Sequence, residues 1–213
     1  GEGSRMGYVD KPLLKLDGKT IIQWIFSHSE KHIDHFLISL NRNHAKYHQF
    51  GYPIVSDVSS QARGPLIGIY SAMEFISRGE NSNDAVYLIT LPGDVPFFPE
   101  ILIPKLMVEM KEQPRDVVIA RSEHRLEPLF AIWALSAKHK LKQHIEDGFF
   151  GPKQILSRLN HQIVSCKTQS ALEFLNINTE KELKIAQTWT EKTDYSLTSI
   201  YEPVSYTHLT LPT

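Results

Sequence analysis

The alternation of short apolar runs with longer helical patterns most constrains what this chain can fold into. Strands are predicted for residues 35–40, 53–57, 85–94, 116–122 and 129–135. Helices are predicted for residues 64–79, 99–111 and 136–147. The run AVYLITLPGD at 85–94 is nearly all apolar, which is typical of a strand buried on both faces. The alternation predicts an α/β fold with a mostly parallel sheet, in which ligands bind beyond the carboxyl ends of the strands.

Composition excludes several classes of function. The 213 residues carry a formal net charge of −1, so the chain as a whole attracts neither nucleic acid nor an anionic membrane. Any phosphate chemistry must therefore come from a local cluster of cations. The single cysteine, Cys166, fits a reducing compartment and is predicted to be a buried bystander. No apolar run approaches the roughly 20 residues of a membrane span and no signal peptide is present, so the cytoplasm is the expected location.

The first residues, GEGSRMGYVDK, are rich in glycine and carry two cations. Glycines let backbone amides turn inward to form an anion-binding nest, and Arg5 adds a bidentate phosphate partner. Lys11 follows as a second cation. The G-K-[ST] ending of a Walker loop is missing, and the spacing is not G-x-G-x-x-G either. Spacing alone leaves a phosphate-binding loop and an unstructured terminus equally open.

Five motifs, in the same order, resemble the molybdenum cofactor guanylyltransferase family (MobA) of the nucleotidyltransferase superfamily. They are GEGSRMGYVDKPLLKLDG, SLNRN, VSDVSSQARGPLIGI, LPGDVPFFP and FLNINT. A sixth segment, EPLFAIW, is similar to the family's H-P-L-F-A-L-W, with Glu127 in place of the usual histidine. The similarity covers roughly residues 1–190, which are expected to form one nucleotidyltransferase domain.

The resemblance implies a three-layer, Rossmann-like nucleotidyltransferase fold with a mixed, mostly parallel sheet. In the family a first strand precedes the glycine-rich motif, so this chain is expected to be truncated at its amino end. The last residues, VSYTHLTLPT, match nothing in the family and resemble a translated sequencing adapter. Residues 191–213 are therefore expected to be a disordered or partly non-native tail.

The implied activity is transfer of GMP from GTP to molybdopterin, with release of pyrophosphate. The attacking pterin phosphate oxygen is already ionised near neutral pH, so no general base is required, and catalysis reduces to alignment and charge stabilisation. The implied catalytic residues are Arg5, Lys11 and Asp94, with Mg²⁺ bound by Asp94. Other proteins of cofactor biosynthesis and the molybdoenzymes are further candidate partners.

The resemblance assigns the GTP site to residues from several motifs. The implied GTP-binding residues are Gly1, Gly3, Ser4, Arg5, Gly7, Lys11, Asn41, Asp57, Gly64, Pro65 and Leu66. Each also has an ordinary structural role open to it. Asp57 and Asn41 are common turn residues, and Pro65 suits the first turn of a helix.

Asp94, Asp10 and the asparagines of FLNINT have similar alternatives. Asp94 could instead cap the helix that begins near Pro99, and Asp10 could form a surface ion pair with Lys11. Asn176 and Asn178 would share one face of an extended segment, and the resemblance places them beside the pterin. Alternatively, Asn178 or Thr179 caps the next helix.

Histidines recur at three- and four-residue spacings, which resembles the spacing of metal ligands. They are His28, His32, His35, His44 and His48. No carboxylate or thiolate is evident to complete a site, so they are predicted to be surface residues and no zinc site is predicted.

Two other functions remain open from the sequence. One is a molybdopterin cytidylyltransferase or another related nucleotidyltransferase, because base choice depends on contacts that the sequence does not define. The other is an inactive nucleotide-binding adaptor for cofactor delivery. The presence of Arg5, Lys11 and Asp94 together favours an enzyme over the adaptor.

Overall fold

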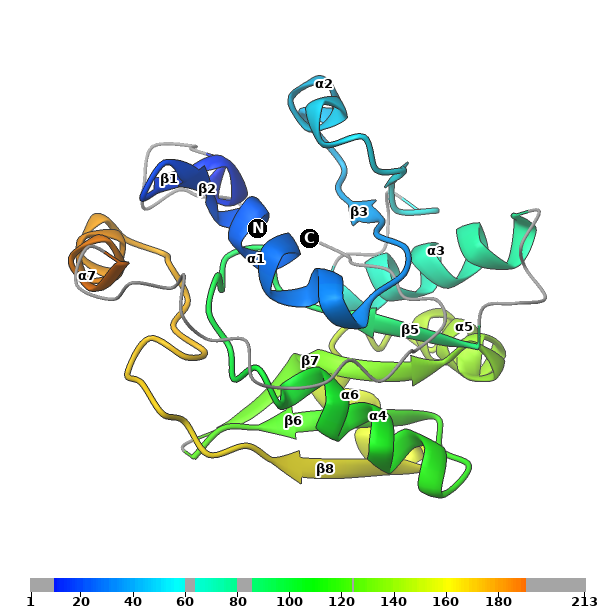
Figure 1. Cartoon of the computed structure of the whole chain (residues 1–213). Coiled ribbons are helices and arrows are strands. Elements are labelled where there is room, and N and C mark those ends of the chain that lie inside the picture. The colour runs from blue at the N-terminus through cyan, green and yellow to red at the C-terminus, as the bar shows by residue number, and fades with distance from the viewer. Residues whose placement is uncertain (1–9, 60–63, 80–85, 124, 191–213) are drawn as a thin grey trace.

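A computed structural model describes residues 10–59, 64–79, 86–123 and 125–190. Its principal sheet has four strands in the order β5–β7–β6–β8 (Figure 1). Their bounds are Tyr87–Thr90 for β5, Val117–Arg121 for β6, Leu126–Ala134 for β7 and His161–Ser165 for β8. β7 is antiparallel to β5 and β6, whereas β8 is parallel to β6, so β5, β6 and β8 all run in one direction. The sheet is therefore mixed, as the sequence predicts, with three of its four strands parallel in direction.

Two short strand pairs accompany this sheet. β1 (Lys15–Leu16) and β2 (Lys19–Thr20) form an antiparallel hairpin. Its two-residue turn, Asp17 and Gly18, has φ values of 48° and 76°, as tight hairpins require. β3 (Ile38–Ser39) pairs in parallel with β4 (Ile54–Val55), within the two runs predicted to be strands.

Helices cover both faces of the four-stranded sheet and produce the three-layer architecture. Alternate residues of β6 face opposite sides, as the period of two in a strand requires. Val118 and Ala120 pack into a core with α1 (Ile21–Ser29) and α4 (Leu102–Glu112). Val117 and Ile119 pack into a second core with α3, α5 and α6. The bounds of the remaining helices are His44–Tyr47 for α2, Pro65–Arg78 for α3, Lys138–Glu146 for α5, Pro152–Ile155 for α6 and Glu180–Thr190 for α7.

The three predicted helices are confirmed with shorter bounds, and several elements were not predicted. α1 begins with a capping box in which the Thr20 hydroxyl accepts from the Gln23 amide. Six of the nine residues of α1 are buried, and this obscures the one-sided periodicity by which a surface helix is recognised. β8 escaped prediction because its sequence, HQIVS, is largely polar. Strand β5 ends at Thr90, so Asp94 lies in the loop beyond it rather than at the end of a strand spanning 85–94.

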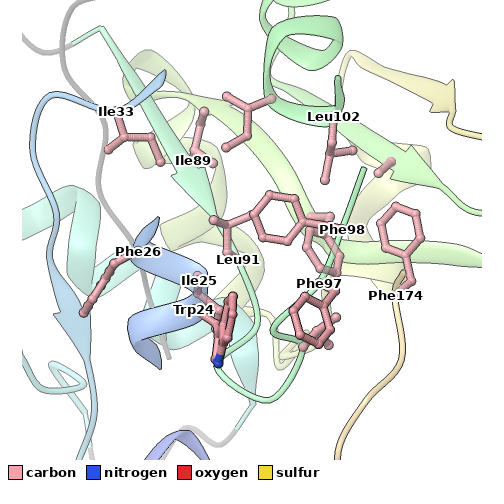
Figure 2. Packing of buried hydrophobic residues seen from close by; sticks show 14 of the residues in the cluster. Trp24, Ile25, Phe26, Ile33, Ile89, Leu91, Phe97, Phe98, Leu102 and Phe174 are labelled. Carbon is pink, nitrogen blue, oxygen red and sulfur yellow. The ribbon is translucent and has the colours of Figure 1, made fainter. Parts of the chain in front are cut away.

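An aromatic core supports this loop (Figure 2). Phe97 packs on Trp24 with ring centroids 5.5 Å apart, and Phe98 packs on Phe130 at the same distance. Phe130 in turn meets Phe174 edge to face at 5.0 Å. Such aromatic pairs each contribute about 0.5–1.5 kcal/mol beyond the area they bury. The loop after β5 is therefore fixed by the core, even though it lies outside regular secondary structure.

The start of α3 depends on a glycine. Gly64 has φ 129° and ψ 167°, a region that essentially only glycine occupies. A β-carbon placed there would lie 2.7 Å from the Phe150 carbonyl oxygen. That same oxygen accepts a hydrogen bond from the Leu66 amide at 3.1 Å. Gly64 thus allows the chain after α5 to pack against the first turn of α3.

We expect Gly64→Ala to lower the free energy of unfolding by about 2–4 kcal/mol, from backbone strain plus the clash with Phe150. Gly51→Ala is the matched control, because Gly51 has φ 74° but open space around it. It should cost only about 1 kcal/mol. Urea unfolding followed by circular dichroism measures both, and equal losses would show that the clash contributes nothing.

Candidate active site

Asp94 lies in the loop that follows β5, at the carboxyl end of the sheet where ligands are expected. Two backbone hydrogen bonds join this loop to the segment that precedes α7. The Ile177 amide donates to the Asp94 carbonyl oxygen at 2.8 Å, and the Phe174 amide donates to the Phe97 carbonyl oxygen at 2.9 Å. Ile177 and Phe174 are both buried. The motifs around Asp94 and Asn178 are therefore held side by side.

Lys11 reaches both motifs. Its ammonium group donates to Asn178 Oδ1 at 2.5 Å and lies 4.0 Å from Asp94 Oδ2. The Lys11 side chain is 18% exposed and that of Asp94 is 30% exposed, so the pair is only partly screened by water. The structure thus brings together three predicted site residues that come from three separate motifs.

The environment of Asp94 favours its neutral form more than water does. Burial raises the pKa of the carboxyl above its ordinary value, while the positive charges of Lys11 and Arg125 oppose that rise. Asp94 does not cap the following helix, because α4 begins at Leu102 with Ile101 as its N-cap residue. The alternative role considered for Asp94 from the sequence is therefore wrong.

The capping alternative is correct for Thr179. Its hydroxyl accepts from the Glu182 amide at 3.4 Å, while the Glu182 carboxylate accepts from the Thr179 amide at 2.8 Å. This reciprocal pair is a capping box at the start of α7. Burial acts to raise the pKa of Glu182, but the hydrogen bonds that its carboxylate accepts from the Asn178 and Thr179 amides help to lower that pKa below its ordinary value. With Thr179 as the cap, the Asn178 side chain is left to bind Lys11.

Asn41 and Asp57 form a second group, beyond the carboxyl ends of β3 and β4. Asn41 Nδ2 donates to Asp57 Oδ2 at 2.7 Å, and the Asp57 amide donates to Asn41 Oδ1 at 2.8 Å. Burial raises the pKa of Asp57, and the hydrogen bond from Asn41 opposes this. A β-carbon at Gly68 would lie 3.2 Å from Ser39 Oγ, a tight contact, and 3.5 Å from Asp57 Oδ1, an ordinary one, so the missing side chain lets α3 approach β3 closely. Within the described residues, no hydrogen bond or ion pair joins Asn41 or Asp57 to the group around Lys11.

The other predicted residues fall into two sets. Gly64, Pro65 and Leu66 begin α3, and Pro65 takes the first helical position as expected. Asn176 lies partly buried in the segment before α7. The remaining GTP-loop residues, Gly1, Gly3, Ser4, Arg5 and Gly7, lie outside the described part of the chain, as does the predicted tail.

Asp10 does not behave as the sequence alternative suggests. Its carboxylate accepts from Asn43 Nδ2 at 2.8 Å and from the buried Tyr47 hydroxyl at 3.2 Å, and Lys46 Nζ lies 3.9 Å away. Burial, aided by Asp10, raises the pKa of Tyr47. Asp10 therefore ties the chain just before Lys11 to the α2 segment, rather than pairing with Lys11.

Sequence reasoning missed three residues at the same edge of the sheet. Glu127 is buried, and its Oε1 accepts from Arg125 Nε at 2.7 Å and from Ser122 Oγ at 3.0 Å. The only sequence signal was that Glu127 departs from the histidine usual in the family. The structure shows what the carboxylate does, since it holds Arg125 beside the Phe174 carbonyl oxygen at 3.3 Å.

The histidine and cysteine predictions have different outcomes. His28 is only partly exposed, because it packs against Phe97 and Phe98 at centroid distances of 5.7 and 6.0 Å, whereas His35 and His48 are exposed as predicted. Burial lowers the pKa of His28. In the described ranges, no group of three or more histidine, cysteine or acidic side chains could hold a metal ion. Cys166 is buried and unpaired, as predicted, and burial raises its pKa.

No helix in the described part of the chain is long and apolar enough to cross a membrane.

This architecture and this site define a nucleotidyltransferase, and comparison with known proteins agrees. Residues 1–163 match the family model described as a MobA-like NTP transferase domain, so the chain belongs to that family. A molybdenum cofactor guanylyltransferase of Haemophilus influenzae is 32% identical over 184 residues, covering 86% of this chain and 92% of the relative. The Shewanella baltica protein of the same name is 27% identical over 187 residues, covering 85% and 89%.

A solved structure supports the fold. Molybdopterin-guanine dinucleotide biosynthesis protein A from Archaeoglobus fulgidus superposes with a TM-score of 0.70 at 24% identity. The match covers 91% of this chain and 96% of that one. The family model and the Haemophilus influenzae relative confirm the resemblance drawn from the sequence motifs.

We predict that Lys11→Met raises the pKa of Asp94 further, because it removes the nearest positive charge that stabilises the carboxylate. Carbon-13 NMR of the side-chain carboxyl, followed as a function of pH, measures this shift. Lys15→Met is the matched control, since Lys15 is exposed on the β1–β2 hairpin. An unchanged Asp94 titration in Lys11→Met would show that the two groups are not coupled.

Proposed function

We propose that this protein transfers GMP from GTP to a phosphate of molybdopterin, forming the guanine dinucleotide cofactor and releasing pyrophosphate. The observation that carries the proposal is the convergence of Lys11, Asp94 and Asn178 at the carboxyl end of the sheet. The names of the relatives, molybdenum cofactor guanylyltransferases, support this choice of substrates.

The reaction is a displacement at the α-phosphorus of GTP. A pterin phosphate oxygen forms the new P–O bond, and the bond to the β-phosphate breaks so that pyrophosphate leaves with the electron pair. The nucleophile is already ionised, which makes proton abstraction by the protein unnecessary. The chain then has to align two anionic substrates and offset their charge.

Lys11 is suited to the triphosphate, because it is a partly buried cation whose ammonium group carries three donors. Arg5 and the amides of the glycine-rich loop complete this side of the site in the proposal. Asn41 and Asp57 bind the ribose or base, and the backbone at Gly64, Pro65 and Leu66 approaches the guanine. Asn176 and Asn178 contact the pterin.

Asp94 fits a role in holding Mg²⁺. It is a single, partly exposed carboxylate, and Mg²⁺ is commonly held by one or two carboxylates together with substrate phosphates and water. When bound, the ion supplies positive charge that offsets the charge developing on the phosphate oxygens.

The proposed substrates are small anions, and other proteins of cofactor biosynthesis, as well as the recipient molybdoenzymes, are proposed as partners. The proposed location is the cytoplasm, as the single cysteine also indicates.

Calorimetry in the presence of Mg²⁺ tests which nucleotide the protein binds more tightly. We expect GTP to bind more tightly than CTP, because the backbone near Gly64 would be matched to guanine. A preference for CTP would assign the protein to the cytidylyltransferases instead. Binding of GTP without any GMP transfer would favour the adaptor.

Asp94→Asn should lower the rate of GMP transfer by about 10²–10³-fold, the usual effect of losing one electrostatic contact in the transition state. The substitution preserves the shape of the side chain, so the hydrogen bond from the Ile177 amide to the Asp94 carbonyl should persist. Radiolabelled GTP in a steady-state assay measures the rate. Asp147→Asn is the control, because Asp147 is exposed after α5 and its side chain is 61% accessible. Equal rates in both variants would exclude Asp94 from the metal site.

The Mg²⁺ dependence should also be lost on acidification. Only the ionised Asp94 carboxylate binds a cation, and its pKa is raised, so the site is neutralised at a higher pH than an ordinary aspartate would be. The apparent Kd for Mg²⁺ should therefore rise as the pH falls through the raised pKa. The same titration of Asp94→Asn reports the contribution of GTP itself, and identical curves for both proteins would contradict the assignment.

A further inference from the structure

Arg125 is a cation at the edge of the candidate site, placed there by an irregularity in the sheet. The register between β6 and β7 shifts between Ile119 and Ala120, so that Ile119 pairs with Ala131 whereas Ala120 pairs with Glu127. The residues between the two pairs bulge out of β7 and include Pro128, which fits a bulge because it has no amide to donate. Bulges re-aim side chains and are frequent next to active sites. Here the bulge sets where β7 begins and hence where Arg125 lies.

The guanidinium group of Arg125 is fixed on two sides. Nε donates to Glu127 Oε1 at 2.7 Å, and Nη2 donates to the Phe174 carbonyl oxygen at 3.3 Å. The Glu127 side chain is only 9% exposed and is itself fixed by the Ser122 hydroxyl. A planar guanidinium held at two of its nitrogens loses little further freedom when it binds a ligand.

The rest of the group is open to solvent. The Arg125 side chain is 51% exposed, and within the described residues its Nη1 makes no hydrogen bond. Arg125 lies beside the loop that carries Asp94, because the Phe174 amide donates to the Phe97 carbonyl oxygen of that loop at 2.9 Å. Arg125 therefore presents unused donors to solvent beside the Asp94 loop.

The contact between Arg125 and Phe174 indicates which substrate the unused donors of Arg125 bind. Phe174 begins the segment that continues to Asn176 and Asn178, the residues assigned to the pterin. Lys11 contacts the far end of this segment and is assigned to the triphosphate. The two cations thus hold the segment at its two ends, and Arg125 is the one at the Phe174 end.

We propose that Arg125 binds the terminal phosphate of molybdopterin, the group that attacks GTP, and that Glu127 is the positioning residue that orients it. This inference rests on the proposed function, since it names a contact of the second substrate in the same site. A bidentate guanidinium suits a phosphate monoester, and charge-assisted hydrogen bonds of this kind are among the strongest that proteins make.

Steady-state kinetics of the full chain, with molybdopterin and GTP varied separately, test the proposal. We expect Arg125→Gln to raise the KM for molybdopterin about 10- to 100-fold, as loss of a charge-assisted contact would. The KM for GTP and the affinity for GTP should stay within about twofold of wild type, a range too small for a lost contact. An unchanged KM for molybdopterin, or equal rises for both substrates, would overturn the proposal.

Glu127→Gln separates positioning from binding. It should raise the KM for molybdopterin less than Arg125→Gln does. Because Glu127 acts through Arg125, the double variant should be no worse than Arg125→Gln alone. Additive losses would show that Glu127 does not act through Arg125, and would overturn that part of the proposal.

A purely structural role for Arg125 is distinguished by two further variants. Arg78→Gln removes another arginine–glutamate pair of 2.7 Å, at the end of α3, and should change neither KM. Arg125→Lys keeps the positive charge but loses the bidentate guanidinium group. It is the variant that tests phosphate binding if Arg125→Gln does not fold. A raised KM for molybdopterin with intact GTP binding in Arg125→Lys supports the proposal, whereas wild-type kinetics overturn it. Failure of the wild-type chain to transfer GMP would overturn the proposed function and this inference together, while wild-type transfer with an unaffected Arg125→Gln overturns the inference alone.

Discussion

The site depends on two backbone hydrogen bonds that fasten the loop after β5 to the segment before α7. They run from the Ile177 amide to the Asp94 carbonyl oxygen and from the Phe174 amide to the Phe97 carbonyl oxygen. Phe97 and Phe174 are buried in the aromatic core beneath, so the two segments cannot separate without exposing large apolar surfaces (Figure 2). The positions of Asp94 and Asn178 relative to each other follow from this joint. The proposed activity therefore depends on the loop after β5 and the segment before α7, whose positions are fixed by packing against the core.

Two positive charges near these backbone hydrogen bonds stabilise the ionised form of the Asp94 carboxylate. Burial alone would favour protonation of Asp94, yet Lys11 and Arg125 both act to keep it ionised. Each cation is held in turn by a polar partner from another part of the fold, Asn178 for Lys11 and Glu127 for Arg125. A site that receives two phosphate-bearing substrates needs such fixed cations, because polyanions that approach each other must be neutralised before they can react.

Much of the fold and of the candidate site was predictable from the sequence, and the elements that were not predicted were missed for physical reasons. The strand of 85–94 and the helix of 64–79 were found because their apolar patterns and their Gly and Pro boundaries are local signals. α1 was missed because a helix buried on most sides loses its one-sided pattern. Thr179 was recognised as a possible cap because capping is local too. The partial burial of His28 against Phe97 and Phe98 depends instead on residues about 70 positions away, a distance that no local pattern reports.

The sequence by itself determined the class of fold and the family, because motif order and hydrophobic period can be recognised without a structure. It also predicted the residues on which the chemistry is proposed to depend. Only the tertiary structure decided which of those residues meet. Lys11 and Asn178 are 167 positions apart, and their contact exists only because the sheet and the joint beyond β5 bring both chain segments to one edge. The role of Glu127 also became clear only from the tertiary structure. A buried carboxylate needs hydrogen-bond partners, and the fold supplies Arg125 and Ser122 as those partners.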